Sequence, residues 1–385
     1  MATDAGPKTD RGLRITPKAL EPQNNNLTLV RLVLASAVIV SHCYFQQTGI
    51  DETDWLSPWL GVPVSWLAVD GFFFLSGFLV FRSLVRHHDR PRFFMARLAR
   101  MYPALLAFVL GTTLIGIAYT TADLRQYFTG ETLRFLLGNL SFIKAYYSLS
   151  GVYCGDATTL CTLNGSLWTL PWEMRCYLGL MLLSLLGLTG TRAMTYFVVP
   201  AAMLFMTLWY LSGLQGLVHT HIPAASYWLA QSARLFPLFL AGCAAAIWRD
   251  RIRLHGGVVL LLLAVHLVAA HTPFAFLTRL LLIAYAVLYV GFRPLRWTPA
   301  ISRLPDYSYG IYIYAYPVMV VVSGWWPGMS AGQLAFANLL AVLPFAAVSW
   351  HFLEKPALEA FRRRSRKAGS APRQWPDQSA PAEAN

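Results

Sequence analysis

The sequence predicts an all-α integral membrane protein that crosses the bilayer about ten times and keeps both termini in the cytoplasm. Three observations support this fold class. Of the 385 residues, 56% are hydrophobic and only 13% are charged, which is about half the charged fraction of an average soluble domain. Long apolar runs approach the roughly 20 residues that span a bilayer. The lysines and arginines are also distributed unevenly between the loops.

About ten segments are candidate spans, at 29–46, 66–85, 101–120, 166–188, 194–212, 233–249, 256–271, 275–292, 308–324 and 333–353. Several are short, which suits tilted or re-entrant segments. The stretch 131–149 is amphipathic and is expected to lie at the membrane interface. The chain thus divides into a polar cytoplasmic tail without a signal peptide (1–26), a transmembrane domain (27–358) and a basic, then disordered, cytoplasmic tail (359–385).

The net charge of +13 indicates the orientation. Because the positive-inside rule accounts for it, no nucleic-acid partner is expected. With the N-terminus inside, most of the basic residues fall on the cytoplasmic side, and the outer loops hold only Arg125, Arg134 and Lys144. Cys154 and Cys161 also fall outside, where a disulfide between them is expected. The five cysteines show no metal-ligand spacing, so no metal is expected.

Ionisable residues within apolar helices are costly and indicate functional sites. Arg31 and His42 are 11 residues apart in the first span, so they share one helix face and lie about 16 Å apart along the axis. Arg31 falls near the cytoplasmic end and His42 near the outer end. Taken alone, Arg31 is more typical of a side chain that extends its charge to the membrane interface. His42 taken alone fits a buried structural histidine as well as it fits a catalytic one.

Two carboxylates on other spans fall at the level of His42. Asp70 lies near the outer end of the second span, and Glu173 lies about two turns below the outer end of the fourth. A histidine beside a carboxylate is the usual arrangement of a general base and its orienting group. We therefore expect these three side chains to converge. The alternative is that Glu173 pairs with Arg175 or with a neighbouring helix.

A cluster of arginines leads into the third span on the cytoplasmic side. In "RFFMARLARMYP", the guanidinium groups of Arg92, Arg97 and Arg100 suit phosphate oxygens, although such a cluster is equally typical of a topology anchor. A substrate with phosphates at this end and a reactive group near His42 has to be long and thin. Coenzyme A thioesters have this shape, and Arg31 would lie between the two ends.

Several short blocks occur in a set order along the chain. They are the ten-residue spacing between Arg31 and His42, "DGFFFLSGFLVFRSL", "RFFMARLARMYP", "NGSLWTLPWEMRCYL", "YSYGIYIYAYPV" and "HFLEKP". Together they resemble the acyltransferase-3 family of membrane O-acyltransferases over about residues 27–358, and the family's glutamate maps onto Glu173. The chain departs from the family at Ala315, where many members carry a histidine, so a chemical role for that helix is not expected.

The resemblance implies transfer of an acyl group, often acetyl, from cytoplasmic acyl-CoA to a hydroxyl of an extracytoplasmic glycan or lipid-linked sugar. The catalytic residues would be His42, as general base, with Glu173 and Asp70. The donor-binding residues would be Arg31, Arg92, Arg97 and Arg100. The substrate-binding residues, with oxyanion donors among them, would be Asn164, Ser166, Trp168 and Tyr314.

A transporter or flippase of a lipid-linked glycan is the alternative function, because buried arginine, histidine and glutamate suit it as well. Such a protein would not depend on acyl-CoA. Ser76 is interpreted as a packing residue beside Gly77 in the second span. We expect the protein to lie among the lipids of a bacterial inner membrane.

Overall fold

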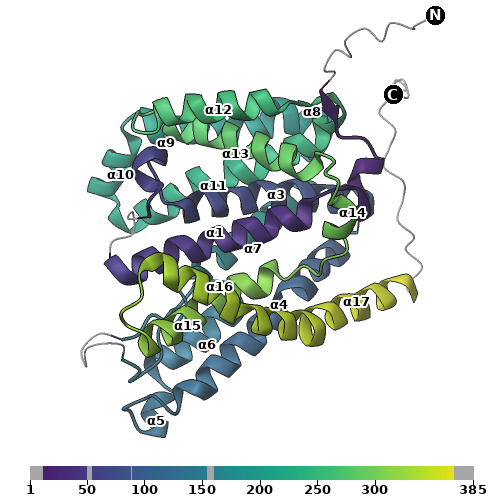
Figure 1. Cartoon of the computed structure of the whole chain (residues 1–385). Helices are drawn as coiled ribbons and strands as arrows, with labels where there is room; N and C mark the ends of the chain where they lie inside the picture. Colours follow the sequence, from purple (N-terminus) through teal and green to yellow (C-terminus); the bar gives the residue numbers. More distant parts are fainter. Residues whose placement is uncertain (1–11, 50–53, 88, 154–159, 368–385) are drawn as a thin grey trace, which may run out of the picture.

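The computed structural model describes residues 12–49, 54–87, 89–153 and 160–367, and most of this chain is helical (Figure 1). The long helices are α1 (Leu27–Thr48), α3 (Val64–His87), α4 (Arg90–Gly116), α7 (Thr169–Leu185), α9 (Val199–Leu211), α11 (Pro223–Trp248), α12 (Gly256–Ala269), α13 (Ala275–Phe292), α15 (Ser308–Trp325) and α16 (Ala331–Val348). Every segment predicted as a span overlaps one of these helices. Seven helical segments of the described chain are long and apolar enough to cross a membrane, so this is an integral membrane protein. The count of ten spans and the cytoplasmic termini stay predictions.

Shorter elements connect the long helices. The short helices are α2 (Ser57–Leu60), α5 (Leu124–Tyr127), α6 (Gly130–Ser141), α8 (Thr191–Ala193), α10 (Leu214–His221), α14 (Thr298–Ile301) and α17 (Lys355–Lys367). A π-helical turn, η4 (Met194–Val198), precedes α9, and another, η6 (Ser349–Glu354), follows α16. Strands β1 (Leu13–Arg14) and β2 (Arg253–Leu254) pair antiparallel. The amphipathic stretch forms α6, which packs on α4 and is too short to span.

Helix α3 lies at the centre and contacts α1, α4, α7, α11 and α13. Its contact with α11 is close because Gly77 meets the backbone of Phe239, and Gly242 of α11 meets the backbone of Phe74. A side chain at either glycine would collide with that backbone, so small residues set the distance between the two helices. This contact determines which side of α3 faces the remaining helices.

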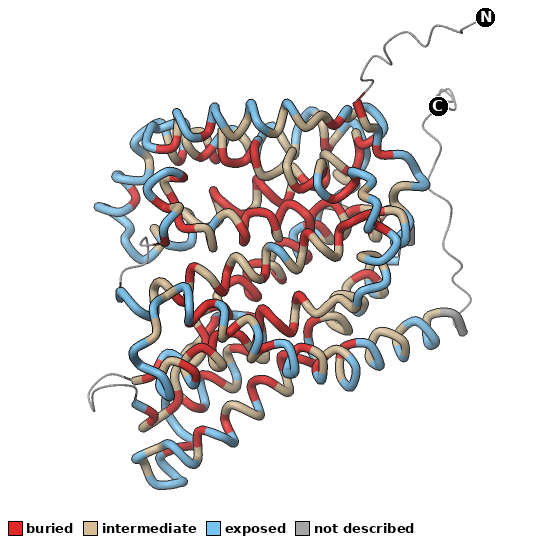
Figure 2. The backbone as a smooth tube through the Cα atoms, viewed as in Figure 1, coloured by how far each residue is buried: buried red, intermediate tan, exposed pale blue. Residues whose placement is uncertain are grey.

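The outer surface of the helices is apolar, as contact with lipid requires. Figure 2 shows the buried residues where helices face one another and the exposed residues around the outside. Exposed large apolar side chains occur on several long helices, among them Leu114, Leu182, Val268 and Phe336. Because a soluble monomer rarely exposes so much contiguous apolar surface, these positions support burial in a bilayer.

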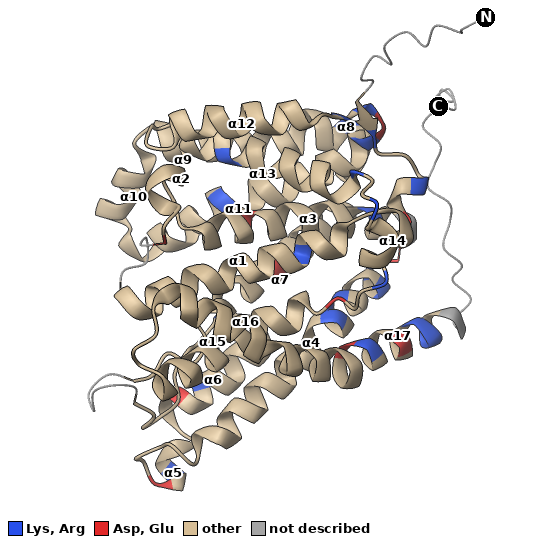
Figure 3. Ribbon diagram, in the orientation of Figure 1, with Lys and Arg blue, Asp and Glu red and all other residues tan. Residues whose placement is uncertain are grey.

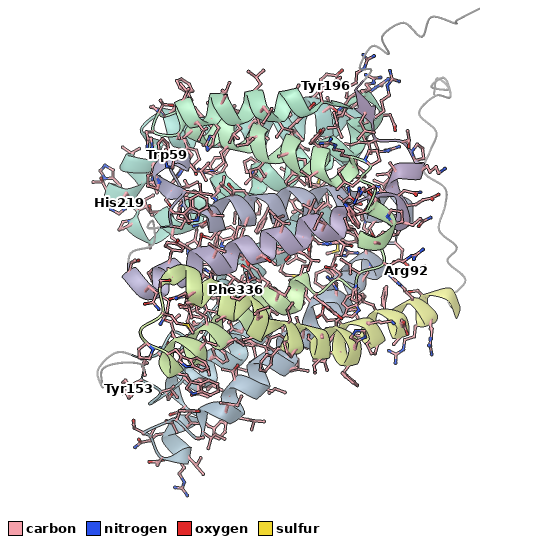
Figure 4. The ribbon with its side chains drawn as sticks, in the orientation of Figure 1. Trp59, Arg92, Tyr153, Tyr196, His219 and Phe336 are labelled. Atoms are coloured by element: carbon pink, nitrogen blue, oxygen red, sulfur yellow. The ribbon has the colours of Figure 1, made fainter. Side chains whose placement is uncertain are left out.

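The two ends of the helical domain differ in charge. Most of the lysines and arginines gather at the end with α8, α14 and α17 (Figure 3), where Arg92 and Tyr196 also lie (Figure 4). Trp59, Tyr153 and His219 lie at the opposite end. We call the first the arginine end; α1, α4 and α15 begin there, whereas α3 and α7 end there. The predicted disulfide involves Cys154, which lies outside the described residues.

Candidate active site

One cavity lies among α1, α3, α4, α7 and α15, and its volume is about 160 Å³. Apolar side chains of α3 form much of its wall. Its polar lining includes three arginines at the arginine end, three polar side chains further in and two hydroxyls toward the opposite end: Arg31, Arg97 and Arg100, then Ser76, Glu173 and Tyr177, then Thr169 and Tyr312. Ser308 and Tyr309 of α15 also contribute to the wall. The cavity thus joins cationic groups at one end to neutral hydroxyls at the other.

Two of the three arginines are held by acids. Arg31 Nε lies 3.3 Å and Arg100 Nη2 2.7 Å from the same oxygen, Asp306 Oδ2. Arg100 Nη1 also lies 3.1 Å from Oε2 of the fully buried Glu354. Burial by itself would raise the pKa of the Asp306 carboxyl, but the two guanidinium groups and the Ser308 hydroxyl outweigh it, so this pKa lies below its usual value. Asp306 therefore stays ionised and orients both arginines.

Arg97 differs from these two neighbours. It lines the same cavity, but it forms no salt bridge with any described carboxylate, and its buried Nε has no hydrogen-bond partner among the described residues. A buried N–H group without a hydrogen-bond partner is costly. Arg97 is therefore the arginine best placed to bind an anionic group that enters the cavity.

Glu173 is hydrogen-bonded to hydroxyls within the cavity. It accepts a short hydrogen bond from the Tyr177 hydroxyl and one of 3.3 Å from Ser76 Oγ. Ser76 Oγ also lies 3.2 Å from the Tyr177 hydroxyl. The alternative pairing of Glu173 with Arg175 does not occur, because Arg175 donates to the carbonyl of Ile143 and stacks on two tryptophans. Ser76, interpreted from the sequence as a packing residue, thus faces the cavity.

His42 lies beyond the opposite end of the cavity and does not line it. Its Nδ1 is 3.4 Å from Ser166 Oγ, and its ring contacts Tyr316 edge-on at 5.3 Å between centroids. Asn164 holds Ser166 in place, because its Oδ1 accepts from the Ser166 backbone N–H at 2.9 Å and its Nδ2 donates to the carbonyl of Ile313 at 2.7 Å. His42 forms no ion pair with a carboxylate among the described residues.

A pair of hydroxyls separates His42 from the cavity. Thr169 Oγ1 and the Tyr312 hydroxyl lie 2.7 Å apart, and the Tyr312 hydroxyl donates to the carbonyl of Ser166 at 2.9 Å. Both side chains line the cavity, while Ser166 contacts His42 on the other side. We call Thr169 and Tyr312 the partition. A hydrogen-bonded route therefore leads from the cavity through the partition and Ser166 to His42.

The remaining predicted site residues lie elsewhere. The structure does not bring Asp70 to His42, because its two oxygens accept from Arg234 and Arg279. The Tyr314 hydroxyl donates to the carbonyl of Ala104, and this side chain faces α4 rather than the cavity. Trp168 ends the 3₁₀ turn η3 (Gly165–Trp168) and packs against the core. Arg92 lies in the first turn of α4, outside the cavity.

Comparison with known proteins shows which family the chain belongs to. A family model described as an acyltransferase domain matches residues 24–350. The chain belongs to the acyltransferase-3 family. This acyltransferase is 28% identical to Nodulation protein 10 of Rhizobium leguminosarum bv. viciae, over 87% of its own chain and 93% of that protein. It is 26% identical to an O-acetyl transferase of Shigella phage Sf6, over 86% of its own chain and 96% of that protein.

A third relative is a putative peptidoglycan O-acetyltransferase of Bacillus subtilis, YrhL. It is 25% identical over 78% of this acyltransferase, and the match covers 52% of the relative's own length. No solved structure matches the chain. Family membership thus establishes a membrane O-acyltransferase, whereas the acyl donor and the acceptor are matters for proposal.

Sequence reasoning missed several residues of the site. Asp306 and Glu354 were not singled out, although each occurs in the sequence at the same predicted membrane side as the arginines that it binds. The excess of positive charge there could have pointed to them, because buried arginines need counterions. The spacing of four residues from Glu173 on one helix could have pointed to Tyr177, because side chains at i and i+4 are neighbours. Among the described residues no cluster of three or more potential ligands could hold a metal ion.

Proposed function

We propose that this acyltransferase moves an acetyl group from cytoplasmic acetyl-CoA to a hydroxyl of an extracytoplasmic glycan or lipid-linked sugar, in the bacterial inner membrane. The observation that carries the proposal is the route to His42 from Arg97, whose buried Nε has no hydrogen-bond partner among the described residues. The names of two relatives support acetyl as the acyl group, and one of them names peptidoglycan, a glycan, as acceptor.

The arginine end of the cavity suits the phosphates of the donor. Arg97 would bind a phosphate directly, because nothing else in the described chain engages its Nε. Arg31 and Arg100 are already oriented by Asp306 and would add their remaining N–H groups. Arg92, in the first turn of α4, would contact a part of the donor outside the cavity. The pantetheine arm would then pass Glu173 and its two hydroxyl partners.

His42 is proposed as the general base. When Nδ1 donates its proton to Ser166 Oγ, the lone pair of Nε2 is free to accept a proton. The acceptor oxygen attacks the thioester carbonyl carbon, forming the O–C bond, and its proton passes to His42. The C–S bond breaks, and the coenzyme A thiolate takes up the proton held by His42, which returns to its neutral form. Ser166, held by Asn164, would thus replace a carboxylate as the group that orients His42.

The two predicted carboxylates take different proposed roles. Glu173 would position the donor arm, because it lines the cavity and is bonded to Ser76 and Tyr177. Asp70 takes no part in the proposed step, because both of its oxygens are engaged by arginines. Trp168, two residues from Ser166 in the same turn, would contact the acceptor. Tyr314 would support α4.

The partition has to open before the thioester can reach His42. Its two hydroxyls are hydrogen-bonded to each other and to the carbonyl of Ser166, so they close the cavity toward His42. Breaking two neutral hydrogen bonds costs about 1–3 kcal/mol in total. Binding of the donor can supply this energy, which would couple opening of the route to the presence of donor.

The test uses full-length protein in nanodiscs with radiolabelled acetyl-CoA and a cell-envelope glycan fraction. His42→Ala is expected to abolish label transfer while donor binding remains. His219→Ala is the matched control, because His219 is an exposed histidine on α10. If wild-type protein neither binds acetyl-CoA nor releases coenzyme A when glycan is added, the proposal is wrong and a transporter or flippase becomes the better reading.

A further inference from the structure

A second group of buried charges lies away from the cavity, between α3, α11 and α13. Arg234 Nε donates to Asp70 Oδ1 at 2.8 Å, and Arg279 Nε donates to Asp70 Oδ2 at 3.0 Å. The exposed fractions of the side chains are 1% for Asp70, 4% for Arg234 and 8% for Arg279. Trp66 lies over Arg234, with 4.1 Å between the guanidinium carbon and the ring centroid. The cluster is thus almost completely removed from solvent.

The charges of this cluster do not balance. Asp70 is the only acid on α3, α9, α11 and α13, the four helices that contribute to it. Helix α12, which packs on α13, carries no acid either. Its ionisable side chain, His266, is bonded to Thr278 through Nδ1. Two arginines therefore share one carboxylate, and one positive charge has no counterion among the described residues.

The same side chains line a small cavity. Asp70, Arg234 and Arg279 contribute to its wall together with Tyr210, and its volume is about 10 Å³. Arg234 Nη1 is buried and has no hydrogen-bond partner among the described residues. A space of this size holds a single water-sized particle. An uncompensated charge in the membrane is costly, and an anion in this space would both neutralise it and accept the free N–H.

We propose that this cavity binds one small inorganic anion of about the size of chloride, held by Arg234 and Arg279. The site is separate from the donor cavity, and it does not depend on the proposed acetyl transfer. The bound anion would stabilise the contact of α3 with α11 and α13. Helix α3 carries Asp70 on the side of the anion and Ser76 on the side of the first cavity. By holding α3 against α11 and α13, the anion would also help to set how α3 faces that cavity.

The test measures binding of radioactive chloride to the full-length protein in phosphatidylcholine nanodiscs by scintillation proximity. Wild-type protein is expected to show one saturable site. Arg279→Gln removes the surplus charge and should weaken chloride binding by about tenfold or more. Arg279→Lys keeps the charge and should retain most of the affinity. Arg134→Gln is the control, because Arg134 is an exposed arginine on α6.

A second variant separates loss of the site from loss of the fold. Leu238→Phe fills the cavity with all charges intact and should also weaken chloride binding, while gel filtration and acetyl-CoA binding remain normal. The proposal is overturned if wild-type protein shows no saturable chloride, which would mean that water fills the cavity. It is equally overturned if Arg279→Gln binds chloride as well as wild type, or if phosphatidylglycerol in the nanodisc displaces chloride, since a lipid phosphate would then be the occupant.

Discussion

Replacing Arg97 by glutamine tests whether the cavity binds a donor that carries phosphates. Arg97 forms no salt bridge with a described carboxylate, and its Nε has no hydrogen-bond partner among the described residues. The change therefore breaks no ion pair, and it removes only the longer-range Coulombic attraction between Arg97 and Glu173. Losing one charge-assisted hydrogen bond to a phosphate removes about 1.5–3 kcal/mol of binding free energy. The Kd for acetyl-CoA should therefore rise by about 10- to 150-fold.

The assay is equilibrium binding of radiolabelled acetyl-CoA to the nanodisc-embedded protein, with thermal unfolding measured on the same samples. Arg192→Gln is the matched control, because Arg192 is exposed on α8 near the arginine end and outside the cavity. A Kd for Arg97→Gln within about twofold of wild type, in a normally folded protein, would refute the reasoning, because it would mean that the free guanidinium does not meet the donor.

Three further predictions concern the acids and hydroxyls around the cavity. Arg100→Gln leaves the fully buried Glu354 without its cation and should cost about 3–5 kcal/mol of unfolding free energy; an unchanged denaturation midpoint would contradict this. Tyr312→Phe removes the two hydrogen bonds of the Tyr312 hydroxyl and keeps the ring. It should therefore change kcat for transfer but leave the Kd for donor nearly unchanged; the reverse pattern would argue against a partition. The pKa of Asp306 is lower in the folded protein than its usual value of about 4. Asp306 therefore stabilises the fold at any pH above that usual value, and this stabilisation is lost as the pH falls through the pKa of the folded state. Unfolding measured against pH should show a smaller loss in acid for Asp306→Asn, and identical profiles would contradict the assignment.

The long helices were predictable because their signal is local. A span such as 275–292 is apolar apart from Thr278 and Arg279, and it forms α13 over the same residues. The depth of each ionisable residue follows from its distance to the helix end. Arg31 and Arg100 could therefore be placed at the same end of the protein, where they share Asp306.

The contacts of the buried polar side chains were less predictable, because they depend on how each helix is rotated about its axis. On α3, Asp70 and Ser76 are six residues apart, which places them about 240° apart around the helix. Asp70 turns toward α11 and α13, and Ser76 turns toward the cavity. The sequence placed Asp70 at the depth of His42, but depth does not decide which neighbour a side chain meets.

The sequence by itself determined the membrane class, the positions of the helices, the family and the set of polar residues buried among apolar ones. Only the tertiary structure decided that Glu173 meets Ser76, that Asp70 belongs to an arginine cluster, and that a partition stands before His42. The physical reason is that a membrane helix is apolar on all sides, so its hydropathy pattern carries little information about rotation. That rotation is set by close contacts between helices, such as those at Gly77 and Gly242.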